Sequence, residues 1–449
     1  MSDPSPQFAS EFHELASQGN FDQLASRLQS TPPEEAARLV DRLEGEELRE
    51  VLVRLNGEYF AALLSQLPLG RATEWLKVVP PASAAAALPF LPSNDQADLL
   101  GALDDDAKAV LAEMPPDASQ ALLGLSQFPE DTAGGLMITE YLAFPQDRTV
   151  ADVVNDLRKN AERYSRFDVQ YAYVVDQEKR LVGTLKLRDL LLLSSDDVIG
   201  QVMQPKPQVV EANATLDRLQ RIFDRLGYLG LPVVDDSNKL LGVVLKTDVE
   251  EAVALRSERT YLLMSGLLGG DELRSMHWGS RVARRAPWLT VSLLLSMTAA
   301  SVIGLYEDTL AAVISLAVFL PVISGVGGNA GNQSLALSIR ELSLGLLEPR
   351  EFSRVIAKEI RVAVLNGLLL GCLLGVIATV WQRQWMLGVV LGLAIVLSTV
   401  LASILGGIVP LALKRVGWDP ALASGPILFT TVDLCGFLIT LGLADLMLT

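Results

Sequence analysis

Cysteine and histidine, the residues of disulfide frameworks, soft-metal sites and many catalytic centres, are scarce in this sequence. The 449 residues include two cysteines, Cys372 and Cys435, and two histidines, His13 and His277. The cysteines lie in apolar segments without disulfide or metal-site spacing, so we expect both to be buried as small hydrophobic side chains. No nucleophile–base pair and no phosphate loop is recognisable, which makes an enzyme the least favoured class of protein.

Basic charge is also scarce in the first part of the chain. Residues 1–280 contain 44 Asp and Glu against 26 Lys and Arg, whereas residues 281–449 contain 9 against 11. Because phosphate binding needs a basic face, nucleic acid is not an expected partner. The acidic excess is compatible with cation binding, and an ordinary solvated acidic surface would also explain it.

Long apolar runs, by contrast, fill the last part of the chain. A helix needs about 20 apolar residues to cross a bilayer. We predict five membrane helices, because a helix satisfies its own backbone hydrogen bonds in lipid. The second of them is interrupted by Pro321 and a glycine cluster. The five stretches are 286–306, 309–339, 362–381, 387–413 and 423–448.

The distribution of Lys and Arg predicts how these helices are oriented. Basic residues gather before the first stretch, between the second and third, and between the fourth and fifth. With five crossings these positions share one face, which the positive-inside rule makes cytoplasmic. The amino terminus shows no signal peptide. We therefore expect a multi-pass protein of the cell (plasma or inner) membrane that crosses the lipid bilayer, with its N-terminus cytoplasmic and its C-terminus outside the cell.

One carboxylate and one polar stretch interrupt the apolar segments. Asp433 lies deep in the fifth stretch, where a carboxylate costs about 2.5–3.5 kcal/mol and normally faces a wet or functional path. The sequence GGNAGNQS occupies residues 327–334 of the second stretch. A hydrogen bond between helices would explain Asp433, and glycine spacing alone often means only helix packing. Together they favour a cation pore.

The residue types around these two features indicate which cation such a pore would take. Asn329, Asn332, Gln333 and Ser334 offer oxygens to an ion or its water shell, and Pro321, Gly328 and Gly331 allow close helix contact or an unwound segment. Thr430 and Thr431 offer further oxygens, or bond back to their own helix. Hard oxygen ligands point to Mg²⁺, which keeps its waters. One Asp for each chain suits a dimer that contributes two.

The acidic part of the chain divides into two kinds of pattern. Residues 1–131 show apolar positions at helical spacing with Pro-rich breaks, which predicts a stacked helical array. Residues 132–251 contain two α/β modules about 60 residues apart, each with an apolar strand ending in Asp, a turn, a second strand and a helix. Their paired segments are 171–176 with 181–191, and 231–235 with 240–253.

This repeat resembles a tandem pair of CBS modules, a family that sometimes binds adenine nucleotides. The Thr and Asp that often contact ribose in that family match Thr247 and Asp248 in the second copy. The first copy has Arg188 before Asp189 and lacks the hydroxyl. The resemblance implies ATP as a possible ligand. Helix capping by Asp189 and Asp248 explains the same residues without any ligand.

The whole chain is similar to MgtE-type magnesium channels, on the order of its modules and on three motifs. The motifs are PEDTAGGLM at 129–137, GGNAGNQS at 327–334 and DPALASGPILFTTVDLCG at 419–436. The resemblance implies a multidomain membrane protein: an all-α N-terminal helical array (1–131), an α/β CBS pair (132–251), a connecting plug helix (252–280) and a five-helix transmembrane domain (281–449). It also implies a homodimer with the pore on its axis, where Asp433 and Asn332 face the metal.

In this family, Mg²⁺ bound at acidic cytosolic interfaces closes the channel. Here Arg256, Arg259 and Thr260 stand where further acids would be usual. The resemblance therefore leaves regulatory Mg²⁺ to the remaining acids of the cytosolic part. Our candidates are Asp248, Glu250, Glu251, Glu258, Glu47 and Glu58. Two alternatives stay open: the same architecture moving Co²⁺ or Mn²⁺, and a membrane nucleotide sensor that transports nothing.

Overall fold

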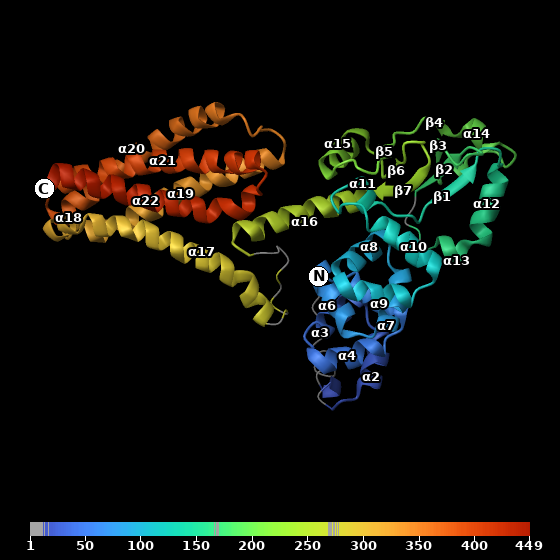
Figure 1. Cartoon of the computed structure of the whole chain (residues 1–449). Coiled ribbons are helices and arrows are strands. Elements are labelled where there is room, and N and C mark those ends of the chain that lie inside the picture. The colour runs from blue at the N-terminus through green and yellow to red at the C-terminus, as the bar shows by residue number, and fades with distance from the viewer. Residues whose placement is uncertain are drawn as a thin grey trace. The chain divides into compact units, whose positions relative to one another are not determined.

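The computed structural model describes residues 12, 14–16, 18–165, 167, 170–267, 272, 274, 276 and 278–449, without the side chains of 422–424 and 426. Both histidines lie outside these residues. The chain forms two compact units, Met1–Arg256 and Ser257–Thr449 (Figure 1). We call them the cytosolic unit and the membrane unit and describe each by itself.

The cytosolic unit begins with the predicted array of short helices. Pro33, Pro81 and Pro116 each open a helix, where the missing N–H costs nothing. Trp75 and Phe60 are among the largest side chains of its core. The helices are α2 (Phe21–Leu28), α3 (Pro33–Val40), α4 (Gly45–Val53), α5 (Gly57–Leu64), α6 (Leu69–Val78), α7 (Pro81–Ala87), α8 (Ser93–Ala102), α9 (Ala107–Ala112) and α10 (Pro116–Leu125).

The two α/β modules follow, each built around a small sheet. The first copy contains β1 (Leu142–Pro145), α12 (Val150–Lys159), α13 (Ala161–Tyr164), β2 (Tyr171–Val175), β3 (Leu181–Lys186), α14 (Ile199–Val202) and β4 (Gln204–Pro205). The second contains β5 (Val210–Glu211), α15 (Leu216–Leu226), β6 (Gly230–Val234) and β7 (Leu240–Leu245). In each copy a parallel strand pair is followed by an antiparallel hairpin. This shared topology confirms the predicted repeat.

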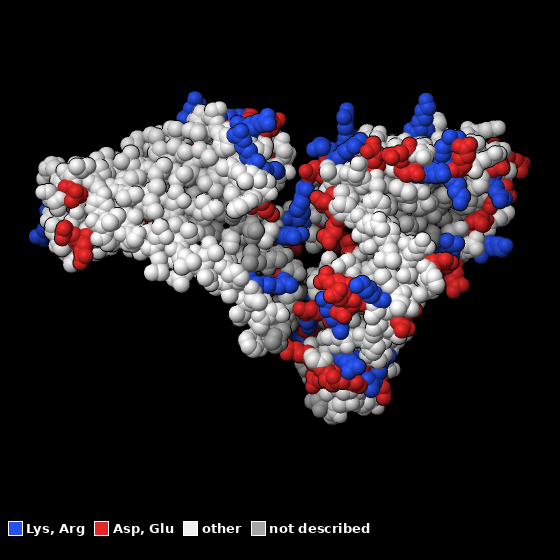
Figure 2. All heavy atoms as spheres, viewed as in Figure 1, with Lys and Arg blue, Asp and Glu red and all other residues white. Residues whose placement is uncertain are grey.

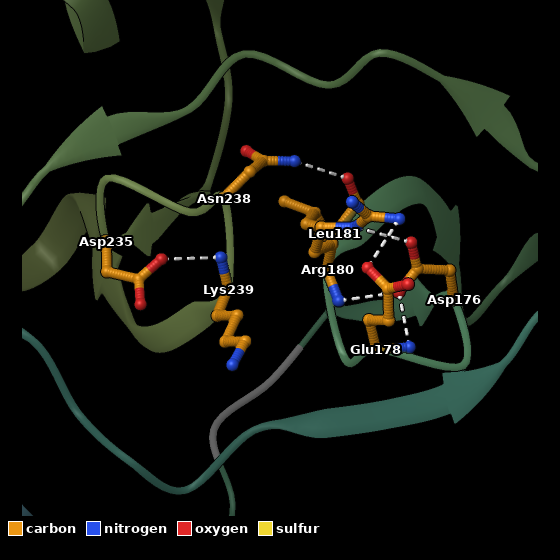
Figure 3. A network of polar contacts seen from close by, with 7 residues as sticks. All are labelled: Asp176, Glu178, Arg180, Leu181, Asp235, Asn238 and Lys239. Carbon is orange, nitrogen blue, oxygen red and sulfur yellow. Dashed lines mark hydrogen bonds and ion pairs between the residues drawn. The ribbon is translucent and has the colours of Figure 1, made fainter.

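The hairpin turns of the two copies bond to each other (Figure 3). Asp176 Oδ1 accepts hydrogen bonds from the backbone N–H groups of Glu178 and Arg180, both at 2.9 Å. Asp235 makes the equivalent pair of bonds in the second copy. Asn238 Nδ2 then donates to the carbonyl oxygen of Leu181 at 2.8 Å, and Leu181 N donates back to Asn238 O at 2.9 Å. Repeated turn chemistry therefore joins the modules into a pseudo-symmetric pair.

A long connecting helix, α16 (Lys246–Met264), begins directly after β7 and continues into the membrane unit. Its existence confirms the predicted connecting helix, but its bounds differ from the predicted 252–280. It starts earlier because the chain enters the helix as soon as the last CBS strand ends. It ends at Met264, and a turn follows through Gly266, which has a positive φ of 80°.

The membrane unit consists mainly of long helices. Among the described residues, four segments are long and apolar enough to cross a membrane: Trp278–Leu305, Phe352–Gln382, Trp385–Val416 and Ile427–Leu448. Figure 2 shows that the visible face of this unit is almost free of charge except toward its ends. The helices are α17 (Trp278–Leu305), α18 (Glu307–Ala312), α19 (Leu316–Ser343), α20 (Phe352–Gln382), α21 (Trp385–Val416) and α22 (Pro420–Leu448).

The second predicted span, 309–339, shows the largest difference between sequence and structure. In the structure this stretch divides into α18 and α19. Although α19 is 28 residues long, its polar stretch keeps it from being as apolar as the four segments named above. Neither Pro321 nor the glycine cluster interrupts α19. A continuous helix keeps its backbone N–H and C=O groups paired, which an apolar surrounding demands. The glycines serve close packing instead: a methyl group on Gly331 would lie 3.2 Å from the carbonyl oxygen of Ala402 in α21.

Candidate functional site

Asp433 lies where α22 packs against α19 in the membrane unit. Its half-buried carboxylate accepts a hydrogen bond from Ser324 Oγ of α19 at 2.5 Å. One turn away, a methyl group on Gly327 would lie 3.1 Å from Val432, so the two helices are in close contact at this level. Ser324 was not among the predicted site residues, because a single serine in an apolar run gives no signal in the sequence.

Asn332 lies on another face of α19 from the residues that contact α22 and α21. It is exposed, as is Pro321, and the two are eleven residues apart, which brings them to the same side of a helix. Asn332 is eight residues beyond Ser324, or about 12 Å along the helix axis. The chain therefore does not bring Asn332 beside Asp433, and the two would act at different depths.

The other predicted pore residues are divided between helix contacts and open surface. Gly328 is buried, and a methyl group there would lie 3.3 Å from the ring of Phe429, while Gly331 is buried against α21 and Leu428. Thr431 donates its hydroxyl to the carbonyl oxygen of Ile427 at 2.6 Å, so it bonds back to its own helix. Thr430 is half-buried one turn from Asp433.

Asn329 is exposed and lines a cavity of about 450 Å³ between α19, α20 and α21, together with Gln333 and Glu359. Glu359 was missed because it lies three residues before the predicted third span. The structure begins that helix at Phe352, which places Glu359 two turns inside α20.

In the cytosolic unit the array and the CBS pair bring acidic side chains together around α8. Burial, and the nearby charges of Asp248, Glu251 and Glu140, raise the pKa of Asp95 to about 6. Burial also raises the pKa of Asp98 to about 7, with further contributions from Glu130 and Asp95. Uncompensated negative charge of this kind favours a bound cation or proton. Asp95 and Asp98 were not predicted, since nothing local distinguishes them from other helix-start acids.

The acids predicted to bind Mg²⁺ in the cytosolic unit lie in different surroundings. Asp248 and Glu251 belong to this acidic group, whereas Glu250 pairs with Lys246 at 3.3 Å. Glu47 and Glu58 are exposed on α4 and α5, and Glu258 is exposed on α16. Across the described residues, no three His, Cys, Asp or Glu side chains are arranged to hold a metal ion. A cation in the acidic group would therefore be bound mostly through water, or after a small closure.

The candidate nucleotide-binding residues lie directly after the second hairpin strand of each CBS copy, after β3 and after β7. Arg188 is exposed and pairs with Asp189 at 3.3 Å, and Thr247 donates its hydroxyl to Asp248 at 3.1 Å. A cavity of about 430 Å³ borders Asp189 in the first copy, with Thr184, Lys186 and Gln204 in its wall. This cavity lies beside the first copy, the one that lacks the threonine before its Asp.

Helical array, CBS pair and apolar helices with an internal carboxylate together define a class: multi-pass membrane transporters of cations with an intracellular N-terminal part. Residues 22–131 match the MgtE intracellular N domain family, 133–196 and 199–255 match the CBS domain, and 320–443 match the MgtE divalent cation transporter family. The chain is 33% identical to the magnesium transporter MgtE of Thermus thermophilus over 449 residues, covering 98% of both chains. The chain belongs to the MgtE family of magnesium transporters.

Two further relatives support this assignment. The magnesium transporter MgtE of Bacillus subtilis is 30% identical over 416 residues, which is 92% of this chain and 88% of the relative. The crystal structure of the cytosolic domain of a Mg²⁺ channel MgtE in complex with ATP has a TM-score of 0.50 and 31% identity. It covers 54% of this chain and 99% of that domain. The chain is thus a multi-pass membrane protein with an intracellular N-terminal domain.

The raised pKa of Asp98 predicts how the stability of the cytosolic unit depends on pH. Between about pH 4 and pH 7 the folded state keeps a proton that the unfolded chain releases, so stability falls as the pH rises through this range. Asp98→Asn removes this cost. We expect its melting temperature at pH 8, in EDTA, to exceed the wild-type value by at least about 2–4 °C, because even a quarter of the cost of this shift, about 1 kcal/mol, has that effect on a domain of this size.

The difference should vanish near pH 4, where both proteins are neutral at this position. Circular dichroism of the cytosolic unit across the pH range measures it. Asp117→Asn, at an exposed position on α10, is the control and should leave the pH profile unchanged. A variant no more stable than wild type at pH 8 would refute the assignment.

Proposed function

We propose that this protein is a homodimeric channel that takes up Mg²⁺ across the cell (plasma or inner) membrane. The observation that carries the proposal is the Asp433 carboxylate between α22 and α19, held by Ser324. An ionisable group at such a place is retained at a cost and marks an ion path. The C-terminus of α22 would then lie outside the cell.

A dimer axis beside α19 and α22 would give this path its chemistry. A twofold axis presents the same residues twice, so two Asp433 carboxylates would face each other. Mg²⁺ gives up its waters reluctantly and is usually bound by one or two carboxylates with several waters retained. Ser324 would fix the orientation of each carboxylate, and Asn332 would meet the hydrated ion about 12 Å further along α19.

Contacts at the end of α16 support a role for this helix in regulating the proposed path. Met264 packs with Leu335 and Ile339 of α19 and with Leu428 and Val432 of α22. A movement of α16 would therefore change the packing of both helices of the proposed path. We propose that cytosolic Mg²⁺ at the acidic group of Asp95, Asp98, Glu140, Asp248 and Glu251 draws the array onto the CBS pair and favours the closed state.

ATP is the proposed ligand of the CBS pair. The related cytosolic domain was crystallised with ATP, and a cavity of about 430 Å³ lies beside Asp189 here. Arg188, with 77% of its side chain exposed, can turn from Asp189 to a phosphate group. Co²⁺ and Mn²⁺ remain the competing transported ions, since hard oxygen ligands also accept them. A membrane nucleotide sensor without transport is the other alternative, and the absence of flux for every divalent cation would favour it.

Substitution of Asp433 tests the ion path. Asp433→Ala removes the carboxylate, and we expect Mg²⁺ flux into proteoliposomes to fall at least tenfold, because the hydrated ion loses its only charged partner in the path. Asp445→Ala, near the outer end of α22, is the matched control and should retain most of the flux. Unchanged flux in the Asp433 variant would exclude this residue from the path. Competition by Co²⁺ and Mn²⁺ in the same assay identifies the preferred ion.

Flux measured with internal Mg²⁺ varied tests the regulation. The double variant Asp95→Asn/Asp248→Asn removes two charges from the acidic group, so inhibition should require at least threefold more internal Mg²⁺. Glu47→Gln, at an exposed position on α4, is the control and should leave the inhibition curve in place. If both variants are inhibited like wild type, the acidic group does not sense Mg²⁺.

Calorimetric titration with ATP tests the nucleotide site. Arg188→Ala should weaken ATP binding about tenfold, the effect of losing one charge-assisted hydrogen bond of about 1.5 kcal/mol. Arg225→Ala on α15, an exposed arginine away from this cavity, should bind ATP like wild type. Equal affinities for both variants would remove Arg188 from the site.

A further inference from the structure

A cavity with several polar side chains in its wall, open on one side, is formed by the helices of a single membrane unit, apart from the proposed path along α19 and α22. Its volume is about 450 Å³, and it lies between α19, α20 and α21. Asp433 is not among its lining residues. Its polar wall includes Asn329, Gln333, Ser334, Glu359, Thr399 and Ser403.

Glu359 supplies the only carboxylate in this wall. The side chain is half-buried, and Oε2 accepts a hydrogen bond from Ser334 Oγ at 2.5 Å. Among the described residues no Lys or Arg pairs with it. A carboxylate held by one hydroxyl in an apolar bundle keeps most of its negative charge unmatched, so the cavity attracts a cation.

Thr399 provides a second, independent sign of a ligand. Only 2% of this residue is exposed, and it lines the cavity from α21. Its hydroxyl has no hydrogen-bond partner among the described residues. Buried polar groups are almost always paired, and an unpaired one costs free energy. A ligand with its water shell in the cavity would satisfy this hydroxyl together with the charge of Glu359.

The donor set indicates which ligand fits. The wall offers one carboxylate, amide oxygens and hydroxyls, and neither sulfur nor imidazole, which selects a hard cation. One carboxylate suits Mg²⁺, which binds with several of its waters retained, better than Ca²⁺, which takes more direct oxygen ligands. The volume equals about 15 water molecules at about 30 Å³ each, enough for an ion with a complete first shell.

We propose that each protomer binds one hydrated divalent cation in this cavity, through Glu359 with Thr399, Ser334 and the amides of α19. The inference extends the proposed function, since the ion is the same as the one transported, but its site is intraprotomer and away from Asp433. Occupation would exchange part of the Ser334–Glu359 bond for bonds to the ion's waters. Binding is therefore coupled to how α19 and α20 are held together.

Direct counting of bound ions tests the site, with Mn²⁺ as the probe because its free form is measured by electron paramagnetic resonance. The full chain in lipid nanodiscs is titrated as wild type, Glu359→Gln, Glu359→Asp and Asp433→Asn. We expect Glu359→Gln to bind one Mn²⁺ fewer for each protomer, and Glu359→Asp to recover it. Asp433→Asn should retain the cavity ion. Thr399→Val should bind that ion at least threefold more weakly.

Two controls separate loss of the site from a general effect of removing a carboxylate and from loss of folding. Glu348→Gln, at an exposed position before α20, should bind as many ions as wild type. Thermal unfolding in EDTA checks that Glu359→Gln is folded, since glutamine can still bond to Ser334. Equal ion counts for Glu359→Gln and wild type would overturn the proposal. Loss of the ion in Glu359→Gln together with unchanged Mg²⁺ flux in Asp433→Ala would keep the cavity site and reject the proposed path.

Discussion

A carboxylate among membrane helices must find a hydrogen-bond donor or a cation, and the membrane unit is arranged around this requirement. The Asp433 carboxylate accepts a hydrogen bond from Ser324, and the Glu359 carboxylate accepts one from Ser334. Both serines belong to α19, ten residues apart, and they bond to two different neighbours, α22 and α20. α19 therefore carries polar groups on more than one side, and it is not among the four segments that are apolar enough to cross a membrane.

Close packing of α19 against its neighbours reduces the cost of its polar groups among membrane helices. Gly331 lets the backbone of α21 approach, and Gly327 does the same for α22. Apolar contacts then surround the polar groups and keep them from lipid, where each unpaired group would be costly. The same closeness connects the end of α16 to the path, since Met264 packs against residues of both α19 and α22.

In the cytosolic unit, too, the fold brings carboxylates together without enough positive charge to balance them. Its fold buries Asp95 and Asp98 and places them near other acids, and burial together with the resulting repulsion raises the pKa of both carboxyl groups. Protons and divalent cations relieve that repulsion in the same way. An interface of this kind holds firmly when cations are abundant and loosens when they are scarce, which is the behaviour a cation sensor needs.

Local patterns in the sequence determined the elements of this protein. Proline spacing predicted the helical array, an internal repeat predicted the CBS pair, and apolar length predicted most of the membrane helices. Asp433 stood out because a single charge in a long apolar run has no local explanation. These inferences succeed because periodicity and hydrophobicity act over a few turns of one segment.

Tertiary structure alone decided which side chains meet. Ser324 reaches Asp433 from 109 residues away, and Thr399 joins Glu359 only because α21 packs against both α19 and α20. The acids of α8 acquire raised pKa values only because the fold buries them, with Asp248 and Glu251 near Asp95 and Glu130 near Asp98. Such meetings depend on how each helix is rotated about its axis and where it crosses the next. Those angles result from the summed packing of all contacts, so no single stretch of sequence encodes them.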